Sequence, residues 1–166
     1  MMKIWNTKIP LKVQNFLWMA WHDRIQTTQQ LRRRNWDGSK DCKFCLKEES
    51  VDHLLFKCPI AVATWCWGRD SLGWERAPSS VKSFHDIINN SGGDSRCLFW
   101  WVMAAVGRSL WKTRNDLVFS NIVIKSPKQV VYKTFGFLKQ WCKMAKKDGA
   151  RMESWLAKLK EGLTRW

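Results

Sequence analysis

Two short segments determine the fold of this chain: Cys42-Lys43-Phe44-Cys45 and, after seven residues, His53-Leu54-Leu55-Phe56-Lys57-Cys58. Its donor residues follow the pattern C-x2-C-x7-H-x4-C within 17 residues. Three thiolates and one imidazole are a complete tetrahedral set for zinc, and they leave no open position for a substrate or a water molecule. The pattern therefore predicts a structural metal ion rather than a catalytic one.

Cys42, Cys45, His53 and Cys58 are the predicted ligands of one zinc ion. The two cysteines that are three apart can hold the ion from a tight knuckle, and the other pair can close the site from a short helical turn and its exit. An iron–sulfur cluster would prefer four thiolates, and the best fourth ligand here is a histidine. The alternative interpretation is a chance pairing of cysteines with a core histidine. Because cysteine binds zinc as a thiolate, we expect metal binding to be coupled to folding and to pH.

The chain of 166 residues is strongly basic, with a formal net charge of +15. Residues 1–60, 61–120 and 121–166 carry +5, +2 and +8, so the two ends are basic and the middle is nearly neutral. A field of this sign attracts polyanions, meaning nucleic acid or, with less support, an anionic membrane surface. The 13 tryptophans and 45% hydrophobic residues still indicate a globular protein with a large apolar core.

The N-terminal residues contain no apolar signal segment, so we expect an intracellular protein of the nucleus and/or the cytoplasm, not a secreted one. Thiols stay reduced in these compartments. Cys66, Cys97 and Cys142 are then expected to be buried core thiols, because free cysteine behaves as a small hydrophobic residue. The most apolar run, residues 97–106, is too short to span a bilayer and is interpreted as the core of a buried helix.

Nearly all periodic segments have helical spacing, so the predicted fold is mostly α. We expect a small zinc knuckle embedded in a Trp-rich helical domain with a helical C-terminal extension. The predicted helices span residues 12–23, 31–34, 59–73, 81–89, 95–119, 127–147 and 152–163, and residues 122–124 are compatible with a short extended piece. We divide the chain into a zinc-binding domain at 1–75, a connection at 76–93 and a strongly basic helical region at 94–166.

Capping and stop signals support these helix boundaries. Thr27 and Gln30 have the spacing of a capping box, and Asp94 is a good N-terminal cap. Gly68 with Gly73, and later Gly149, are the expected stops.

Two groups of basic residues are candidates for binding phosphates. The first surrounds the knuckle and consists of Arg32, Arg33, Arg34, Lys43 and Lys47. The second lies on one face of the helix after Pro127 and includes Lys139, Lys143, Lys146 and Lys147. Charge combined with stacking on aromatic side chains can hold single-stranded nucleic acid. The simpler interpretation is a solvated lysine face.

Three aromatic residues are interleaved with the first basic group. Phe56 is expected in the core beneath the zinc loop, because a small metal module needs apolar packing. For Trp36 and Phe44 both interpretations, core and nucleic-acid contact, stay open.

Catalytic patterns are weak. His22-Asp23 and His85-Asp86 have no spaced partner that would define a triad or a second metal site. The chain has no P-loop, no glycine-rich dinucleotide turn and no metalloprotease pattern. We therefore expect no enzyme activity, no small-molecule substrate and no membrane partner.

Several blocks around the ligands form a recognisable set. They are Ile4-Trp5, then Ile9–Val13 with Phe16–Trp18, then Leu31–Arg34, then Cys42-x2-Cys45, and then Glu49–Pro59 with Trp65 after it. Further on, Trp111 to Phe119 has the form W-x-x-R-N-x-x-x-F. Together these blocks resemble the reverse-transcriptase zinc-binding domain of plant LINE-type (non-LTR) retroelements, here as a stand-alone protein. The resemblance is close over about residues 4–67 and looser over about residues 97–145.

This resemblance implies a retroelement-derived accessory module that binds nucleic acid, with RNA favoured over DNA. No Tyr-x-Asp-Asp polymerase motif is present, since Tyr132 is the only tyrosine, and no spaced acidic set supports a ribonuclease H. The alternative function is a protein-interaction scaffold, recruited from a retroelement for regulation or defence, that meets a protein partner through its Trp-rich helices. A residual nuclease or polymerase is a third interpretation.

Overall fold

The computed structural model describes residue 5 and residues 7–145 and 149–166. Within these residues no strand is present, and the β pairing consists of one isolated bridge between Asp41 and Glu48. The elements are α1 (Leu11–Trp21), α2 (Thr28–Arg33), the π-helical turn η2 (His53–Lys57), α3 (Pro59–Leu72), α4 (Val81–Asn89), α5 (Gly93–Ser120), α6 (Lys128–Met144) and α7 (Gly149–Arg165). The predicted fold class, mostly α with an embedded knuckle and a helical extension, is confirmed.

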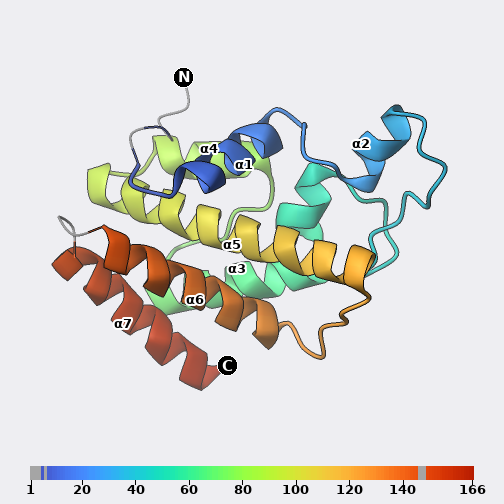
Figure 1. Cartoon of the computed structure of the whole chain (residues 1–166). Helices are drawn as coiled ribbons and strands as arrows, with labels where there is room; N and C mark the ends of the chain where they lie inside the picture. Colours follow the sequence, from blue (N-terminus) through green and yellow to red (C-terminus); the bar gives the residue numbers. More distant parts are fainter. Residues whose placement is uncertain (1–4, 6, 146–148) are drawn as a thin grey trace.

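Helix α5 is the central element of the fold. Figure 1 shows α1 and α4 along one side of α5 and α6 with α7 along the other, and contacts of α5 with α1, α3, α4 and α6 agree with this arrangement. Residues Leu98–Gly107 are buried on every side of the helix, which is typical of a helix that lies inside a core. The predicted buried helix is therefore confirmed. None of the described helices combines the length and the apolar character that a membrane span requires.

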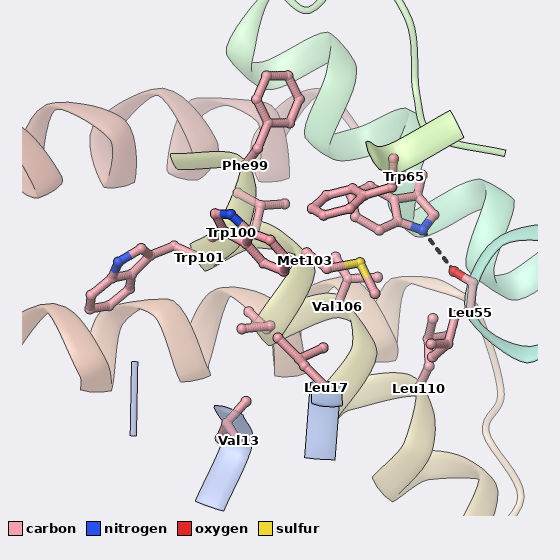
Figure 2. Packing of buried hydrophobic residues seen from close by; sticks show 14 of the residues in the cluster. Val13, Leu17, Leu55, Trp65, Phe99, Trp100, Trp101, Met103, Val106 and Leu110 are labelled. Carbon is pink, nitrogen blue, oxygen red and sulfur yellow. Dashed lines mark hydrogen bonds between the residues drawn. The ribbon is translucent and has the colours of Figure 1, made fainter. Parts of the chain in front are cut away.

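The core joins residues from the whole described chain into one apolar cluster. Figure 2 shows Trp65 from α3, Trp100 and Trp101 from α5, and Leu17 from α1 within this cluster. The Trp65 indole donates a hydrogen bond of 2.8 Å to the carbonyl of Leu55, so its polar edge is satisfied inside the core. The core thus draws on both the region expected to bind zinc and the basic C-terminal region.

Two glycines that were predicted to end helices do not do so, because a single glycine does not by itself stop a helix. Gly68 lies buried inside α3 and does not end it; a Cβ there would lie 3.8 Å from Val102 of α5, an ordinary packing distance. Gly73, with φ of 67°, is the residue that ends α3. Gly149 begins α7 rather than stopping α6, which ends at Met144. Residues 146–148, where α6 was predicted to end, lie outside the described residues.

The helix caps of α2 and α5 and the loop after α5 also differ from the prediction. Thr27 accepts a hydrogen bond from the Gln30 backbone N–H at 3.4 Å, but the Gln30 side chain bonds to Asp23, so half of the capping box forms. Asp94 lies in the first turn of α5, and Gly92 is the N-cap. Residues 122–124 form an irregular loop, not an extended piece, after Asn121 ends α5 in the left-handed conformation with φ of 52°.

Candidate metal centre and basic surfaces

The knuckle loop, residues 41–50, is closed by its own backbone. The Cys42 N–H donates to the Lys47 carbonyl at 2.6 Å, and the Leu46 N–H donates to the Cys42 carbonyl at 2.8 Å. Leu46 takes a φ of 63° to complete this turn, a conformation that favours glycine. The bridge between Asp41 and Glu48 joins the two sides of the loop. This tight turn presents the first two cysteines to the same point.

The π-helical turn η2 explains how His53 and Cys58 can bind one ion. In an α-helix, residues five apart differ by about 140° around the axis and cannot share a ligand. Here the Cys58 N–H bonds to the His53 carbonyl at 2.7 Å, the i to i+5 pattern of a π turn. The wider turn brings both side chains to one side. Pro59, which has no N–H, then begins α3 immediately after Cys58.

The four donor atoms converge at distances that suit zinc. They lie within 4.8 Å of one another, with 4.0 Å between Cys42 Sγ and Cys58 Sγ and 3.2 Å between Cys45 Sγ and His53 Nε2. A tetrahedral zinc ion with normal bond lengths would hold such atoms about 3.6–3.8 Å apart. Small shifts of the thiols are therefore enough to close the coordination sphere. The structure brings together the four predicted ligands.

Protonation of the cluster also suits a metal. Burial lowers the pKa of His53 and so favours the neutral imidazole, which is the form that binds zinc. The hydrogen bond from the Cys42 thiol lowers the pKa of Cys58, and the same bond together with burial raises the pKa of Cys42. Two buried thiols that share one proton in this way are a pair that a divalent cation would hold as two thiolates.

A buried ion pair fixes the knuckle loop to α5. Arg114 donates to Glu49 through Nη2 to Oε1 at 2.8 Å and through Nε to Oε2 at 3.3 Å, and both side chains are almost fully buried, at 2% and 0% exposed. The bidentate geometry satisfies both carboxylate oxygens. The guanidinium also lies over the Trp111 ring at 5.3 Å and donates to Asn115. The W-x-x-R-N block is thus an anchor for the knuckle loop.

The same carboxylate holds α2. The Thr28 backbone N–H, at the start of α2, donates to Glu49 Oε1 at 2.9 Å, and the Thr28 hydroxyl donates to the Lys40 carbonyl at 2.7 Å. Glu49 and Arg114 were absent from the predicted site residues. Their occurrence in the two blocks quoted above was the available signal, but the sequence does not show that an acid and a base 65 positions apart meet.

The basic residues around the knuckle are exposed. Arg32, Arg33 and Arg34 project from α2 and its end, and Lys43 and Lys47 project from the knuckle loop. Arg33 pairs with Asp23 at 3.0 Å, and both side chains stay substantially in solvent. Because Glu49 ties α2 to the knuckle loop, these two sources of positive charge hold a fixed relation to the metal site.

The described members of the second basic group lie on α6. Lys139 and Lys143 are exposed near the C-terminal end of α6, and Lys146 and Lys147 lie outside the described residues. Figure 1 shows α2 and the C-terminal end of α6 at opposite ends of the molecule. The contact of Trp141 with Trp101 places the C-terminal part of α6 beside the N-terminal part of α5. Arg114, which binds the knuckle loop, lies about 20 Å further along α5. The structure therefore places Lys139 and Lys143 away from the basic residues around the knuckle.

The aromatic residues near the knuckle fall into three environments. Phe56 is buried and stacks on Trp65, which confirms the core prediction. Phe44 is half-buried and packs against the core from the knuckle loop. Trp36 is 42% exposed, and its ring lies so close to Gly38 that a Cβ there would meet it at 1.9 Å. Trp36 thus keeps an accessible face outside the core.

The remaining cysteines and histidines form no second site among the described residues. Cys142 is buried as expected, but Cys66 and Cys97 are half-buried. The Trp21 indole donates to His85 Nε2, and burial lowers the pKa of His85, so this histidine is held neutral by packing. His22 is exposed and bonds within α1 to the Trp18 carbonyl at 2.8 Å.

Comparison with known proteins gives a family match and a similar relative. Residues 1–65 match the family model described as zinc-binding in reverse transcriptase. A putative ribonuclease H protein of Arabidopsis thaliana is 30% identical to the chain over 63 residues, which are 37% of this chain and 10% of that relative. The matching segment is therefore a small part of the relative's length. No solved structure shows significant similarity.

The geometry and the family match describe the same segment. All four donor residues lie within residues 1–65, and so do the knuckle loop and the π-helical turn that position them. A closed Cys3His set supports folding rather than catalysis. Residues 1–65 are thus similar to the zinc-binding family associated with reverse transcriptases, and their Cys3His cluster supports one structural zinc ion.

Proposed function

We propose that the chain is a retroelement-derived accessory module that binds nucleic acid, with RNA favoured over DNA, and that it acts without catalysing a reaction. Contacts to phosphates come from Arg32, Arg33, Arg34, Lys43 and Lys47, and a second surface comes from Lys139, Lys143, Lys146 and Lys147. We place its action in the nucleus and/or the cytoplasm.

The observation that carries the proposal is a rigid, exposed basic surface beside the zinc site. All the described members of both groups are exposed. Among these described members, the ion pair found is that of Arg33 with Asp23. Such side chains are available for phosphates. Trp36 adds an accessible aromatic face to the first group, and aromatic faces of this kind stack on unpaired bases.

The test is a fluorescence anisotropy titration of the zinc-loaded protein against single-stranded RNA, the matching DNA and an RNA duplex, at several salt concentrations. We expect affinity to fall steeply with salt, with a slope of about 0.7 per phosphate contact for single strands. Replacing Arg32, Arg33 and Arg34 by alanine should then reduce this slope by about 2. Absence of binding at low salt contradicts the proposal.

A charge-matched control separates local contact from net charge. Replacing Arg69, Arg76 and Lys82 by alanine removes the same charge from the nearly neutral middle of the chain. We expect this variant to keep the wild-type salt slope. Equal losses in both variants would show that the charge acts as a diffuse field, without a binding surface at α2.

A protein-interaction scaffold for regulation or defence is the second candidate, and one observation supports it. The Trp-rich helices bury most of their tryptophans, so they offer little surface to a partner. Phe119, Ile122 and Val123, however, are 73%, 57% and 71% exposed at the end of α5 and in the following loop. Apolar residues grouped in this way are typical of contact sites. A partner that survives nuclease treatment in a pull-down favours this candidate.

A further inference from the structure

A groove lies between the zinc knuckle and the loop that joins α5 to α6. Its volume is about 310 Å³, at the lower end of the range for small-ligand sites. Lys43 and Phe44 line it from the knuckle loop, and Ile60 lines it from the start of α3. Leu117 of α5 lines it too, with Val123 and Lys125 from the following loop. It therefore depends on residues far beyond the segment that matches the zinc-binding family.

The lining has an apolar floor and a cationic rim. Phe44, Ile60 and Leu117 are half-buried, whereas Lys43 and Lys125 are exposed. None of the nine lining residues is acidic. A ligand that fits this surface has a flat apolar part and a negatively charged part close to each other, which is the chemistry of a nucleotide.

We propose that this groove takes one unpaired base of a single-stranded nucleic acid, with its base against Phe44 and its flanking phosphates at Lys43 and Lys125. The inference rests on the proposed function and specifies it further, because a base can contact the Phe44 ring in this groove only when it is out of the stack. In a duplex the bases are stacked and paired, and extruding one carries an energetic cost. The protein should therefore prefer single strands over duplexes.

The test uses labelled oligouridylate RNA of roughly twelve nucleotides, within the site size of one single-strand-binding domain. A second strand has the same length and charge but abasic residues throughout. We expect the zinc-loaded wild type to bind the base-bearing strand about tenfold more tightly, the effect of stacking roughly one base. A fully paired RNA of the same length should bind no better than the abasic strand.

Two variants assign that preference to the groove. Phe44→Leu keeps an apolar side chain but removes the aromatic face, and Val123→Asp places a carboxylate on the rim at a residue that is 71% exposed. Both should bind the two strands equally. Lys128→Ala is the control, because Lys128 is exposed at the start of α6 but does not line the groove; it should keep the preference. Zinc content and melting temperature confirm that each variant is folded, and Val123→Asp tests the groove without touching the knuckle.

The outcomes separate the two proposals. Wild type that binds no strand at low salt overturns the proposed function and this inference with it. Wild type that binds base-bearing, abasic and paired RNA equally overturns the groove assignment alone, as does an unchanged preference in both variants. An acidic peptide with phenylalanine side chains is titrated in parallel. If the groove variants weaken the peptide and leave RNA binding intact, the groove belongs to a protein partner.

Discussion

The knuckle loop and helix α5 reach a fixed structure by opposite means. Between Asp41 and Ser50 the buried side chains are those of Cys42 and Glu49, a metal ligand and one half of an ion pair. Between Leu98 and Gly107 every residue is buried, mostly by apolar contacts. The stability of the knuckle loop is thus concentrated in a few polar interactions, whereas that of α5 is distributed over many contacts. Single substitutions should therefore have unequal effects in the two regions.

Removal of the metal should have the largest effect. Cys45→Ser should lose zinc and destabilise at least the first half of the chain, because structural zinc contributes about 10–16 kcal/mol in small zinc-binding peptides. Elemental analysis gives the metal content, and hydrogen exchange should show fast exchange in the knuckle loop with protection remaining in α5.

Cys66→Ser is the control for metal loss. Cys66 is a half-buried thiol like Cys45, but it is not one of the four converging residues. It should keep a full equivalent of zinc. A well-folded wild type without zinc, or a Cys45→Ser variant with wild-type stability, contradicts the assignment of the metal site.

Breaking the buried ion pair should come next. Glu49→Gln leaves Arg114 charged and buried without its partner, and we expect a loss of about 3–5 kcal/mol in the free energy of unfolding. Denaturant unfolding followed by tryptophan fluorescence measures this loss. Asp70→Asn is the matched control, since it breaks the Arg69 pair at the surface, and such pairs contribute about 0–1 kcal/mol. Similar losses in the free energy of unfolding for both variants would show that the buried pair stabilises the fold no more than a surface pair.

Steric overlap in the helical bundle should have a smaller effect. A Cβ at Gly162 of α7 would meet Ser71 Oγ at 1.8 Å, whereas at Gly136 of α6 no heavy atom lies within 4 Å. Gly162→Ala should therefore cost about 1–3 kcal/mol through overpacking. Gly136→Ala should stabilise by about 0.5–1 kcal/mol through helix propensity. Thermal melting of the two variants measures the difference, and shifts in the same direction would contradict the close approach of α3 and α7.

The smallest effect concerns backbone strain. Leu46 in the knuckle loop and Asn121 after α5 both have positive φ, at 63° and 52°. This conformation is less favourable for leucine than for asparagine. Leu46→Gly should therefore stabilise the protein by about 0.5–1 kcal/mol, whereas Asn121→Gly should be close to neutral. Denaturant midpoints of the zinc-loaded proteins test this difference. A destabilised Leu46→Gly variant would indicate that the leucine side chain makes a contact of its own.

The sequence predicts local features of this protein well and distant contacts poorly. The ligand spacing identifies the metal site, and Pro59 and Ser80 mark helix starts, because these signals act within a few residues. Glu49 gives no local sign that it will be buried, since its partner Arg114 comes from another helix. Gly68 and Gly149 were likewise misread as stop signals, since Gly68 lies inside α3 and Gly149 begins α7.

The bidentate ion pair between Glu49 and Arg114 also determines how far the chain can be truncated. A fragment that ends at residue 65 would retain the four zinc ligands but would lose the guanidinium that neutralises Glu49. The carboxylate would then have to become hydrated, which opens the contact between α2 and the knuckle loop. We therefore expect the shortest piece that keeps the zinc-binding fold intact to extend through Arg114. On this expectation, the segment that sequence similarity outlines is shorter than the unit that folds.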